Sequence, residues 1–107
     1  MSRVLRALLN SLGLVPSLHP VARGALRALA DGRELSGYEI CKIPAAAWPL
    51  AREGVGFGAI YPRLRLLESR GLVSGRWVDP SPGRRRRHHV YVITPRGRRA
   101  LEREMRG

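Results

Sequence analysis

The feature that most restricts the fold is an apolar repeat of helical period. The repeat ends at a glycine, and two strand-like segments follow it. Apolar residues recur from Phe57 at intervals of three and four, and Gly71 follows them; this spacing predicts an amphipathic helix that ends at the glycine. The segments LVSGRWV (72–78) and HHVYVIT (88–94) are rich in β-branched and aromatic residues and flank the turn-forming DPSPG and four arginines. They predict a β-hairpin with an arginine-loaded tip. The apolar stripe of the helix is Ile60, Leu64 and Leu67, with Arg63, Arg65 and Arg70 off it.

Two helices are predicted near the start of the chain. Leucines at spacings of three and four follow Ser2, which can cap a helix over about residues 3–13 that ends at Gly13. A second helix begins near Pro20, because proline suits the first helical turn, and stops at Asp31–Gly32. The apolar positions are Leu5, Leu8, Leu9 and Leu12 in the first helix, and Val21, Ala25, Leu26 and Leu29 in the second.

A short third helix is indicated by a capping box. Ser36 and Glu39 stand three residues apart, the arrangement in which each side chain bonds to the other residue's backbone N–H at a helix start. We therefore predict a helix from Gly37 to about Ile43.

The stretch between this helix and the apolar repeat is predicted to be a loop. Pro44 is expected to close the preceding helix, and residues 44–58 hold two prolines and three glycines. Such a composition interrupts regular structure, so we expect at most one helical turn, near residues 45–48.

The last helix is predicted to start where Thr94 provides a cap and Pro95 a first-turn residue, with Leu101 and Met105 as its packing residues. The fold class is therefore mainly α with a β-hairpin (α+β). A short capped helix, a connector and a second helix with a basic outer face form a helix-turn-helix, and the hairpin adds a wing. We expect a winged helix-turn-helix domain over residues 18–107 and an extra N-terminal helix, a dimerisation arm, over residues 1–17.

The charge of the chain is strongly positive and unevenly distributed. The 107 residues include 20 Lys and Arg against 8 Asp and Glu, a formal net charge of +12. Residues 1–55 hold seven basic and four acidic side chains, whereas residues 56–107 hold thirteen and four. Basic surfaces attract polyanions through counterion release, so the second half is expected to carry a nucleic-acid-binding surface.

The inventory of reactive side chains argues against an enzyme. The three histidines (His19, His88 and His89) and the single Cys41 show no metal-ligand spacing, and no phosphate loop, nucleophile motif or dinucleotide fingerprint occurs. We expect no catalytic residue, no metal and no cofactor. No stretch approaches the roughly 18 consecutive apolar residues of a membrane span, so no membrane contact is expected. One cysteine allows no internal disulfide, which favours the cytoplasm.

Three blocks of the sequence carry a family resemblance. In this order, LSGYEI (35–40), GAIYPRLRLLESRGLV (58–73) and RRRRHHVYVITPRGRRALE (84–102) resemble the PadR family of winged helix-turn-helix transcriptional regulators, over about residues 21–104. The resemblance implies a dimeric bacterial repressor, acting at the nucleoid, that binds a palindromic operator in double-stranded DNA. Tyr61 and its neighbours would form the recognition helix and the hairpin the wing.

The predicted contacts fall into two groups. Four adjacent arginines repel one another unless a polyanion faces them, and the charged side chains of the recognition helix are placed to reach base edges. The residues predicted to contact DNA are Ser36, Tyr38, Phe57, Ala59, Tyr61, Arg63, Arg65, Arg84, Arg85, Arg86, Arg87 and His88. Those predicted at a homodimer interface are Leu5, Leu8, Leu9, Leu12, Leu101 and Met105. The N-terminal apolar stripe is larger than a small domain needs, and the last helix is shorter than the C-terminal dimerisation region that the resemblance implies, so the first helix is expected to pack on the partner beside the last.

Large aromatic residues also have a packing interpretation. Tyr38 is expected to pack between helices more than to contact DNA, and Tyr61 is balanced between the two roles. Because large aromatics bury much area, Trp48 is expected to anchor the loop and Trp77 to pack on the domain. The resemblance allows a small-molecule effector, but no residue of the sequence supports one.

The predicted function is that of a sequence-specific DNA-binding transcriptional regulator, a repressor acting as a homodimer. The alternative is a nucleic-acid-binding protein without sequence preference, either nucleoid-associated or RNA-binding, that uses the same winged fold. A third interpretation is a winged module that binds a protein partner through its N-terminal helix. The DNA or RNA sites that the chain selects would separate the first two.

Overall fold

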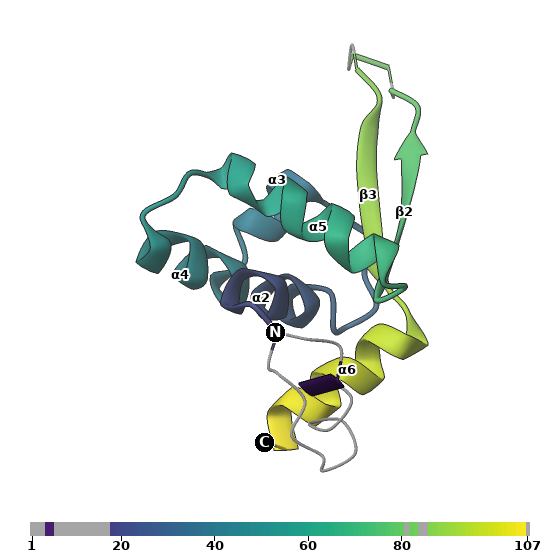
Figure 1. The fold of residues 1–107 in the computed structure, drawn as a ribbon. Helices are drawn as coiled ribbons and strands as arrows, with labels where there is room; N and C mark the ends of the chain where they lie inside the picture. The colour runs from purple at the N-terminus through teal and green to yellow at the C-terminus, as the bar shows by residue number, and fades with distance from the viewer. Residues whose placement is uncertain (1–3, 6–17, 81, 84–85, 107) are drawn as a thin grey trace.

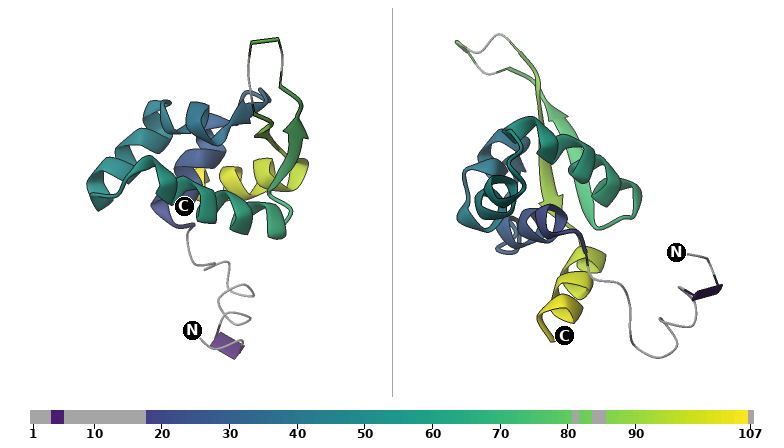
Figure 2. Two further views of the ribbon diagram at one scale, coloured as in Figure 1. Left: turned by 90° about the horizontal axis from the view of Figure 1, so that it is seen from above. Right: turned by 60° about the vertical axis from the view of Figure 1, so that its left-hand side comes forward.

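The computed structural model describes residues 4–5, 18–80, 82–83 and 86–106. A body of helices carries a β-hairpin that extends well beyond it (Figure 1), and the further views show the same projection (Figure 2). This confirms the predicted helix-rich, winged class. The elements are α2 (Pro20–Ala28), β1 (Leu35–Ser36), α3 (Gly37–Cys41), α4 (Pro44–Glu53), the 3-10 turn η1 (Phe57–Ala59), α5 (Ile60–Ser69), β2 (Val73–Val78), β3 (His88–Ile93) and α6 (Pro95–Arg106).

The helix predicted over residues 3–13 lies outside the described residues except for two of them. Val4 and Leu5 are both exposed. Leu8, Leu9 and Leu12, and with them the proposed arm, belong to the part of the chain that the structure leaves undescribed.

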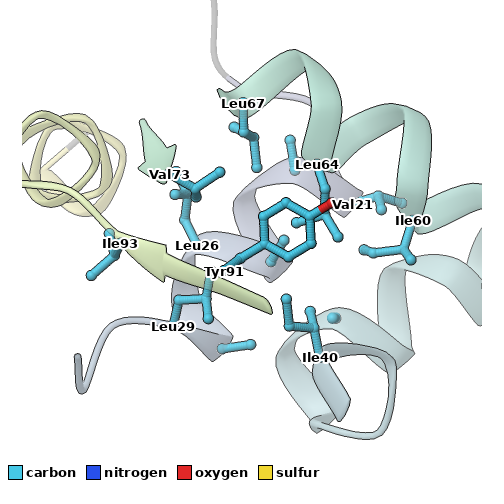
Figure 3. Close-up of a cluster of buried hydrophobic side chains, with 14 of the residues drawn as sticks. Val21, Leu26, Leu29, Ile40, Ile60, Leu64, Leu67, Val73, Tyr91 and Ile93 are labelled. Atoms are coloured by element: carbon cyan, nitrogen blue, oxygen red, sulfur yellow. The ribbon is translucent and has the colours of Figure 1, made fainter. Parts of the chain in front are cut away.

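Helix α2 supplies the centre of the core. It begins at Pro20, and the preceding His19 caps it by accepting a hydrogen bond from the Val21 N–H at Nδ1 (3.2 Å). The apolar face predicted for this helix is confirmed, because Val21, Ala25, Leu26 and Leu29 are all fully buried. Apolar burial on this scale is the main favourable term in folding. Figure 3 shows several of these side chains gathered around the ring of Tyr91.

The capping box of α3 is present as predicted. Ser36 Oγ accepts from the Glu39 N–H (3.1 Å), and Glu39 Oε1 accepts from the Ser36 N–H (3.0 Å). The helix ends at Cys41, two residues before the predicted end at Ile43.

The predicted loop over residues 44–58 is wrong. Residues 44–53 form the ten-residue helix α4, with Pro44 at its first turn and Pro49 in its interior. Proline at the first turn loses no hydrogen bond. Pro44 was expected only to close the preceding helix, but it also starts the next one. Pro49 leaves the Ala45 carbonyl without its usual N–H partner, and that carbonyl lies against Gly24 of α2, where a Cβ would collide with it. Close packing against α2 therefore keeps α4 helical.

The expectation that Trp48 anchors a loop is also wrong. Trp48 lies on α4 with 71% of its surface exposed. It faces a groove of about 300 Å³ between α2 and α4.

Helix α5 matches the predicted apolar stripe. Ile60, Leu64 and Leu67 are buried, and the 3-10 turn η1 leads into the helix. Gly71 follows at φ 74, the left-handed conformation that glycine adopts most readily and that commonly ends helices.

The hairpin belongs to a three-stranded antiparallel sheet of order β1-β3-β2. The sequence did not predict β1, which has only two residues and pairs Leu35 with Tyr91. The register of β2 and β3 pairs Trp77 with His89 and Gly75 with Tyr91. These residues therefore share one face of the sheet.

The predicted cap of α6 is confirmed. Thr94 Oγ1 accepts from the Gly97 N–H (3.0 Å) and donates to the Gly71 carbonyl (2.6 Å), so it joins the start of α6 to the residues after α5. Helix α6 lies at the end of the molecule opposite the hairpin tip (Figures 1 and 2). Leu101 is buried in the core of its own chain, whereas Met105 is exposed.

Candidate nucleic-acid interface

A groove separates the helix-turn-helix from the hairpin. It has a volume of about 830 Å³, and α3, α5, β2, β3 and the descending end of the hairpin tip contribute its walls. The lining mixes exposed aromatic rings with cationic side chains. The lining residues are Ser36, Gly37, Tyr38, Glu39, Tyr61, Arg65, Glu68, Trp77, Arg87, His88, His89 and Tyr91.

Helix α5 forms one wall because of its periodicity. Tyr61, Arg65 and Glu68 stand at i, i+4 and i+7, on a different face from the buried leucines, and such residues lie above one another on a helix surface. Tyr61 and Arg65 are exposed, and Glu68 is half-buried. Arg63 is half-buried and does not line the groove. Of the two predicted recognition arginines, Arg65 is therefore the one in the groove wall.

The start of α3 forms the adjoining wall. The capping box fixes the first turn of the helix, and Tyr38 projects from it with 54% of its surface exposed. Lys42 Nζ lies 4.2 Å from the centroid of the Tyr38 ring, and the Phe57 ring meets that ring edge-on at 6.3 Å. Tyr38 therefore packs against Phe57 and also presents an exposed aromatic surface with an adjacent cation to the groove.

The hairpin wall is a row of stacked rings. The Trp77 and His89 rings are nearly parallel (14°) with centroids 4.8 Å apart, and the His89 and Tyr91 centroids are 4.5 Å apart. His89 Nδ1 also lies 3.2 Å from the Tyr91 hydroxyl. Burial raises the pKa of Tyr91, and the Glu68 carboxylate adds to the effect. Tyr91 sits in the core. Trp77 packs on the domain through the His89 ring, yet 56% of its surface remains exposed.

Glu68 and Gly75 connect α5 to the hairpin. Glu68 Oε2 accepts a hydrogen bond from the Gly75 N–H (3.0 Å). A Cβ at position 75 would lie 2.5 Å from His89 Nε2 and 2.7 Å from Glu68 Oε2. A side chain at position 75 would therefore displace His89 or Glu68 from these positions, so the glycine lets the row of rings pack close to α5. The hydrogen bond also occupies the one carboxylate that α5 contributes to the groove.

The tip of the hairpin adds a positive charge to the groove. Arg87 Nε lies 3.4 Å from Asp79 Oδ1, and the guanidinium carbon is 5.6 Å from the centroid of the Trp77 ring. Arg86 is exposed and does not line the groove. Arg84 and Arg85 fall outside the described residues.

A second ion pair anchors the base of the hairpin. Arg76 Nε and Nη2 donate to the two carboxylate oxygens of Glu34, each at 2.6 Å. This paired geometry holds the pKa of Glu34 below its ordinary value and raises the pKa of Arg76. Glu34 precedes β1, so the pair ties that edge of the sheet to β2.

The side chains that line the groove are mainly aromatic, cationic and hydroxyl groups, which suit binding of a charged ligand. Within the part of the chain that the structure describes, no three His, Cys, Asp or Glu side chains are grouped so as to hold a metal. Cys41 is buried, which raises the pKa of its thiol, and a protonated buried thiol is a poor nucleophile. None of the described helices is long and apolar enough to cross a membrane.

The structure brings together about half of the predicted DNA contacts. Ser36, Tyr38, Tyr61, Arg65, Arg87 and His88 line the groove. Phe57 adjoins it through Tyr38, whereas Ala59 packs against the core. Sequence reasoning missed Glu68, Trp77 and His89 as lining residues. Alternation along the strands could have placed Trp77 with His89 and Tyr91, given the register.

The model of the transcriptional regulator PadR-like family matches residues 26–103. No curated protein sequence matches the chain significantly.

Several solved structures share the fold. A PadR family transcription regulator from Clostridium difficile R20291 has a TM-score of 0.61 and 24% identity, over 80% of this chain and 83% of that one. A protein of Streptococcus mutans UA159 has a TM-score of 0.64 and 29% identity, over 80% and 48%. Bacillus subtilis PadR, crystallised in complex with operator DNA, has a TM-score of 0.62 and 26% identity, over 79% and 46%. The chain thus spans about half the length of the last two proteins.

Proposed function

Because the chain belongs to the PadR-like family of transcriptional regulators, we propose that it binds double-stranded DNA through the groove between α5 and the hairpin and thereby regulates transcription. The observation that carries the proposal is that Tyr61 and Arg65, on an exposed face of α5, line the same groove as Arg87 and His88 of the hairpin. Two separate elements then present cations to one continuous ligand.

The order of the elements suits duplex DNA as the ligand. In winged helix-turn-helix proteins the second helix of the motif enters the major groove, which admits an α-helix. Helix α5 occupies that position here, after α3 and α4. The strand of DNA that borders the major groove would cross the groove of the protein, with its base edges toward Arg65 and its phosphates toward Arg87. B. subtilis PadR binds operator DNA with the same fold, which supports the proposal.

Base contacts and phosphate contacts have different roles in this proposal. Arg65 on α5 is suited to donate to a guanine edge, the commonest specific contact of arginine. The hairpin arginines bind phosphates, which fix position and add affinity without selecting sequence. The formal charge of +12 supports a strong electrostatic contribution to binding.

The finer proposal is a repressor that binds a palindromic operator as a homodimer. The leucine repeat of residues 5–12 is proposed to supply an apolar stripe for the partner, together with Met105, which is exposed on α6. Leu101 is buried in the core of its own chain, so Met105 is the better candidate of the two on α6. A chain lacking residues 1–14 is expected to be monomeric by light scattering; an unchanged dimer mass would contradict this role of the N-terminal segment. DNA as the ligand implies the cytoplasm and the nucleoid as the place of action.

Selection of binding sites from a pool of random duplexes tests the proposal. The pool is expected to converge on an inverted repeat whose half-sites are centred about one helical turn, or a multiple of it, apart. Uniform affinity for all duplexes, or preference for a structured RNA of the same length, would favour the alternative of a nucleic-acid binder without sequence selectivity.

A further inference from the structure

The row of rings on the hairpin continues into the side chain of Arg87. Exposure increases along the row, from the buried Tyr91 through the half-buried His89 to Trp77, whose surface is 56% exposed. The guanidinium of Arg87 lies over the outer end of the row, 5.6 Å from the Trp77 centroid. A charged side chain at a solvent-exposed tip is thus connected by ring contacts to the core.

We propose that Trp77 is a positioning residue, which holds the Arg87 guanidinium over the groove so that it binds a phosphate of the nucleic acid seated there. The proposal rests on the proposed function and names a positioning residue for that site. Neither Trp77 nor Arg87 needs to contact a base.

Stacking suits this role because it uses the face of the guanidinium and leaves its edge free. Arginine stacks on aromatic rings through its planar face, whereas its N–H groups donate within that plane to carboxylates or phosphates. In the protein alone, Asp79 Oδ1 lies 3.4 Å from Arg87 Nε. The Asp79 side chain is 91% exposed, so a phosphate can replace it as the partner of the Arg87 N–H groups while the cation–π contact with Trp77 remains.

The base of the row fixes its position relative to α5. The Tyr91 hydroxyl contacts His89 Nδ1, and Gly75 brings both His89 and Glu68 close to the strand. The bond from the Gly75 N–H to Glu68 ties the same strand to α5. A shift of Trp77 would therefore change the separation between Arg65 on α5 and Arg87 on the hairpin.

Binding of the full-length chain to a random-sequence duplex of about 30 base pairs, measured by fluorescence anisotropy over a range of NaCl concentrations, tests the proposal. Arg87→Ala should weaken binding and reduce the salt slope by about 0.9 per bound subunit, the value for one phosphate. Arg86→Ala removes the same charge beside the groove and serves as the matched control, with a smaller expected change in slope. Trp77→Ala removes no charge, yet it should also reduce the slope, and Trp77→Phe should restore most of it.

The double variant separates positioning from direct contact. If Trp77 acts through Arg87, Trp77→Ala combined with Arg87→Ala binds no more weakly than Arg87→Ala alone, because coupled residues are not additive. Additive losses, or a Trp77→Ala variant with lower affinity and an unchanged salt slope, would show that Trp77 contacts the nucleic acid itself and would overturn the proposal. Thermal unfolding of each variant checks that the fold is retained.

A measurement on the free protein keeps this inference distinct from the proposed function. The indole ring current should shift the side-chain NMR resonances of Arg87, and Trp77→Ala should abolish the shift while Trp77→Phe reduces it. Absence of the shift in the wild-type chain would overturn the positioning role whether or not DNA binds. If the shift is present but the wild-type chain does not bind duplex DNA, the proposed function is contradicted. Trp77 would then still position Arg87, but Arg87 would have no phosphate to bind.

Discussion

The ring of Tyr61 lies directly against the backbone of Gly37. A Cβ at position 37 would stand 2.6 Å from Tyr61 Cε1 and 3.2 Å from Tyr61 Cζ. Gly37 is the first residue of α3 and Tyr61 the second of α5, so this contact sets the approach of the two helices at the edge of the groove. The backbone of Gly37 does not have a positive φ; the ring, and not the backbone conformation, is what requires glycine here.

Gly37→Ala is therefore expected to weaken DNA binding by displacing the Tyr61 ring. In the wild-type background the same substitution should also lower the free energy of unfolding. In a Tyr61→Ala background it should instead raise the free energy of unfolding by about 0.5–1 kcal/mol, because alanine is the better helix former once the ring is gone. Urea unfolding of the four chains of this cycle, together with their affinity for one duplex, measures both effects. Equal effects of Gly37→Ala in both backgrounds would show that the ring contact has no energetic consequence.

The two arginines of α5 are expected to differ. Arg65 lines the groove and Arg63 does not, so Arg65→Ala should cost about 1–3 kcal/mol at a selected site and relax preference at one base pair in each half-site. Arg63→Ala removes the same charge from the same helix and should cost less. Competition binding with single-base variants of the selected site measures the preference. Equal losses for Arg65→Ala on selected and random DNA would assign that residue to phosphate binding.

Thr94 is expected to stabilise the fold through its two hydrogen bonds. Thr94→Ala removes the cap of α6 and the bond to the Gly71 carbonyl, and should lower the free energy of unfolding by about 1–2 kcal/mol. Thr94→Ser keeps the hydroxyl and should recover most of the loss. Urea denaturation at constant m-value checks the prediction; a serine variant as unstable as the alanine variant would point to the lost methyl group instead.

The contribution of Tyr91 to the free energy of unfolding should decrease at alkaline pH. Burial raises the pKa of its hydroxyl above the ordinary value of 10.0, so the folded state holds this proton more tightly than the unfolded state. The contribution is complete below the unfolded pKa and is lost as the pH rises through the folded pKa. The difference in unfolding free energy between the wild-type chain and Tyr91→Phe should therefore shrink above about pH 10. A difference that stays constant across that range would contradict the shift.

Most helices of the fold follow from local signals in the sequence. The cap of α3, the apolar stripe of α5 and the Thr94–Pro95 start of α6 each depend on residues within one or two turns of one another. Helix α4 escaped prediction because its two prolines normally interrupt helices, and the compensation comes from the packing of the Ala45 carbonyl on Gly24, far away in sequence. Local patterns cannot register such tertiary support.

Some residues that line the groove could be predicted from the sequence, but the way in which the fold brings them together could not. Charge and helical position identified Arg65 and Arg87, and both line it. Trp77, His89 and Glu68 join them only through the register of β2 on β3 and through the room left by Gly75. Those relationships depend on which residue pairs with which across the hairpin, and a shift of one position would move every side chain to the other face.

Mapping of backbone amide resonances during titration with a duplex of the selected sequence tests whether DNA binds in the groove between α5 and the hairpin. The largest chemical-shift changes are expected on the first turn of α3, on α5 around Tyr61 and Arg65, and on the hairpin from Arg86 to Tyr91. The face formed by α2 and α6, which also carries arginines, should change little. Changes concentrated on α2 and α6, with the groove unaffected, would contradict the account.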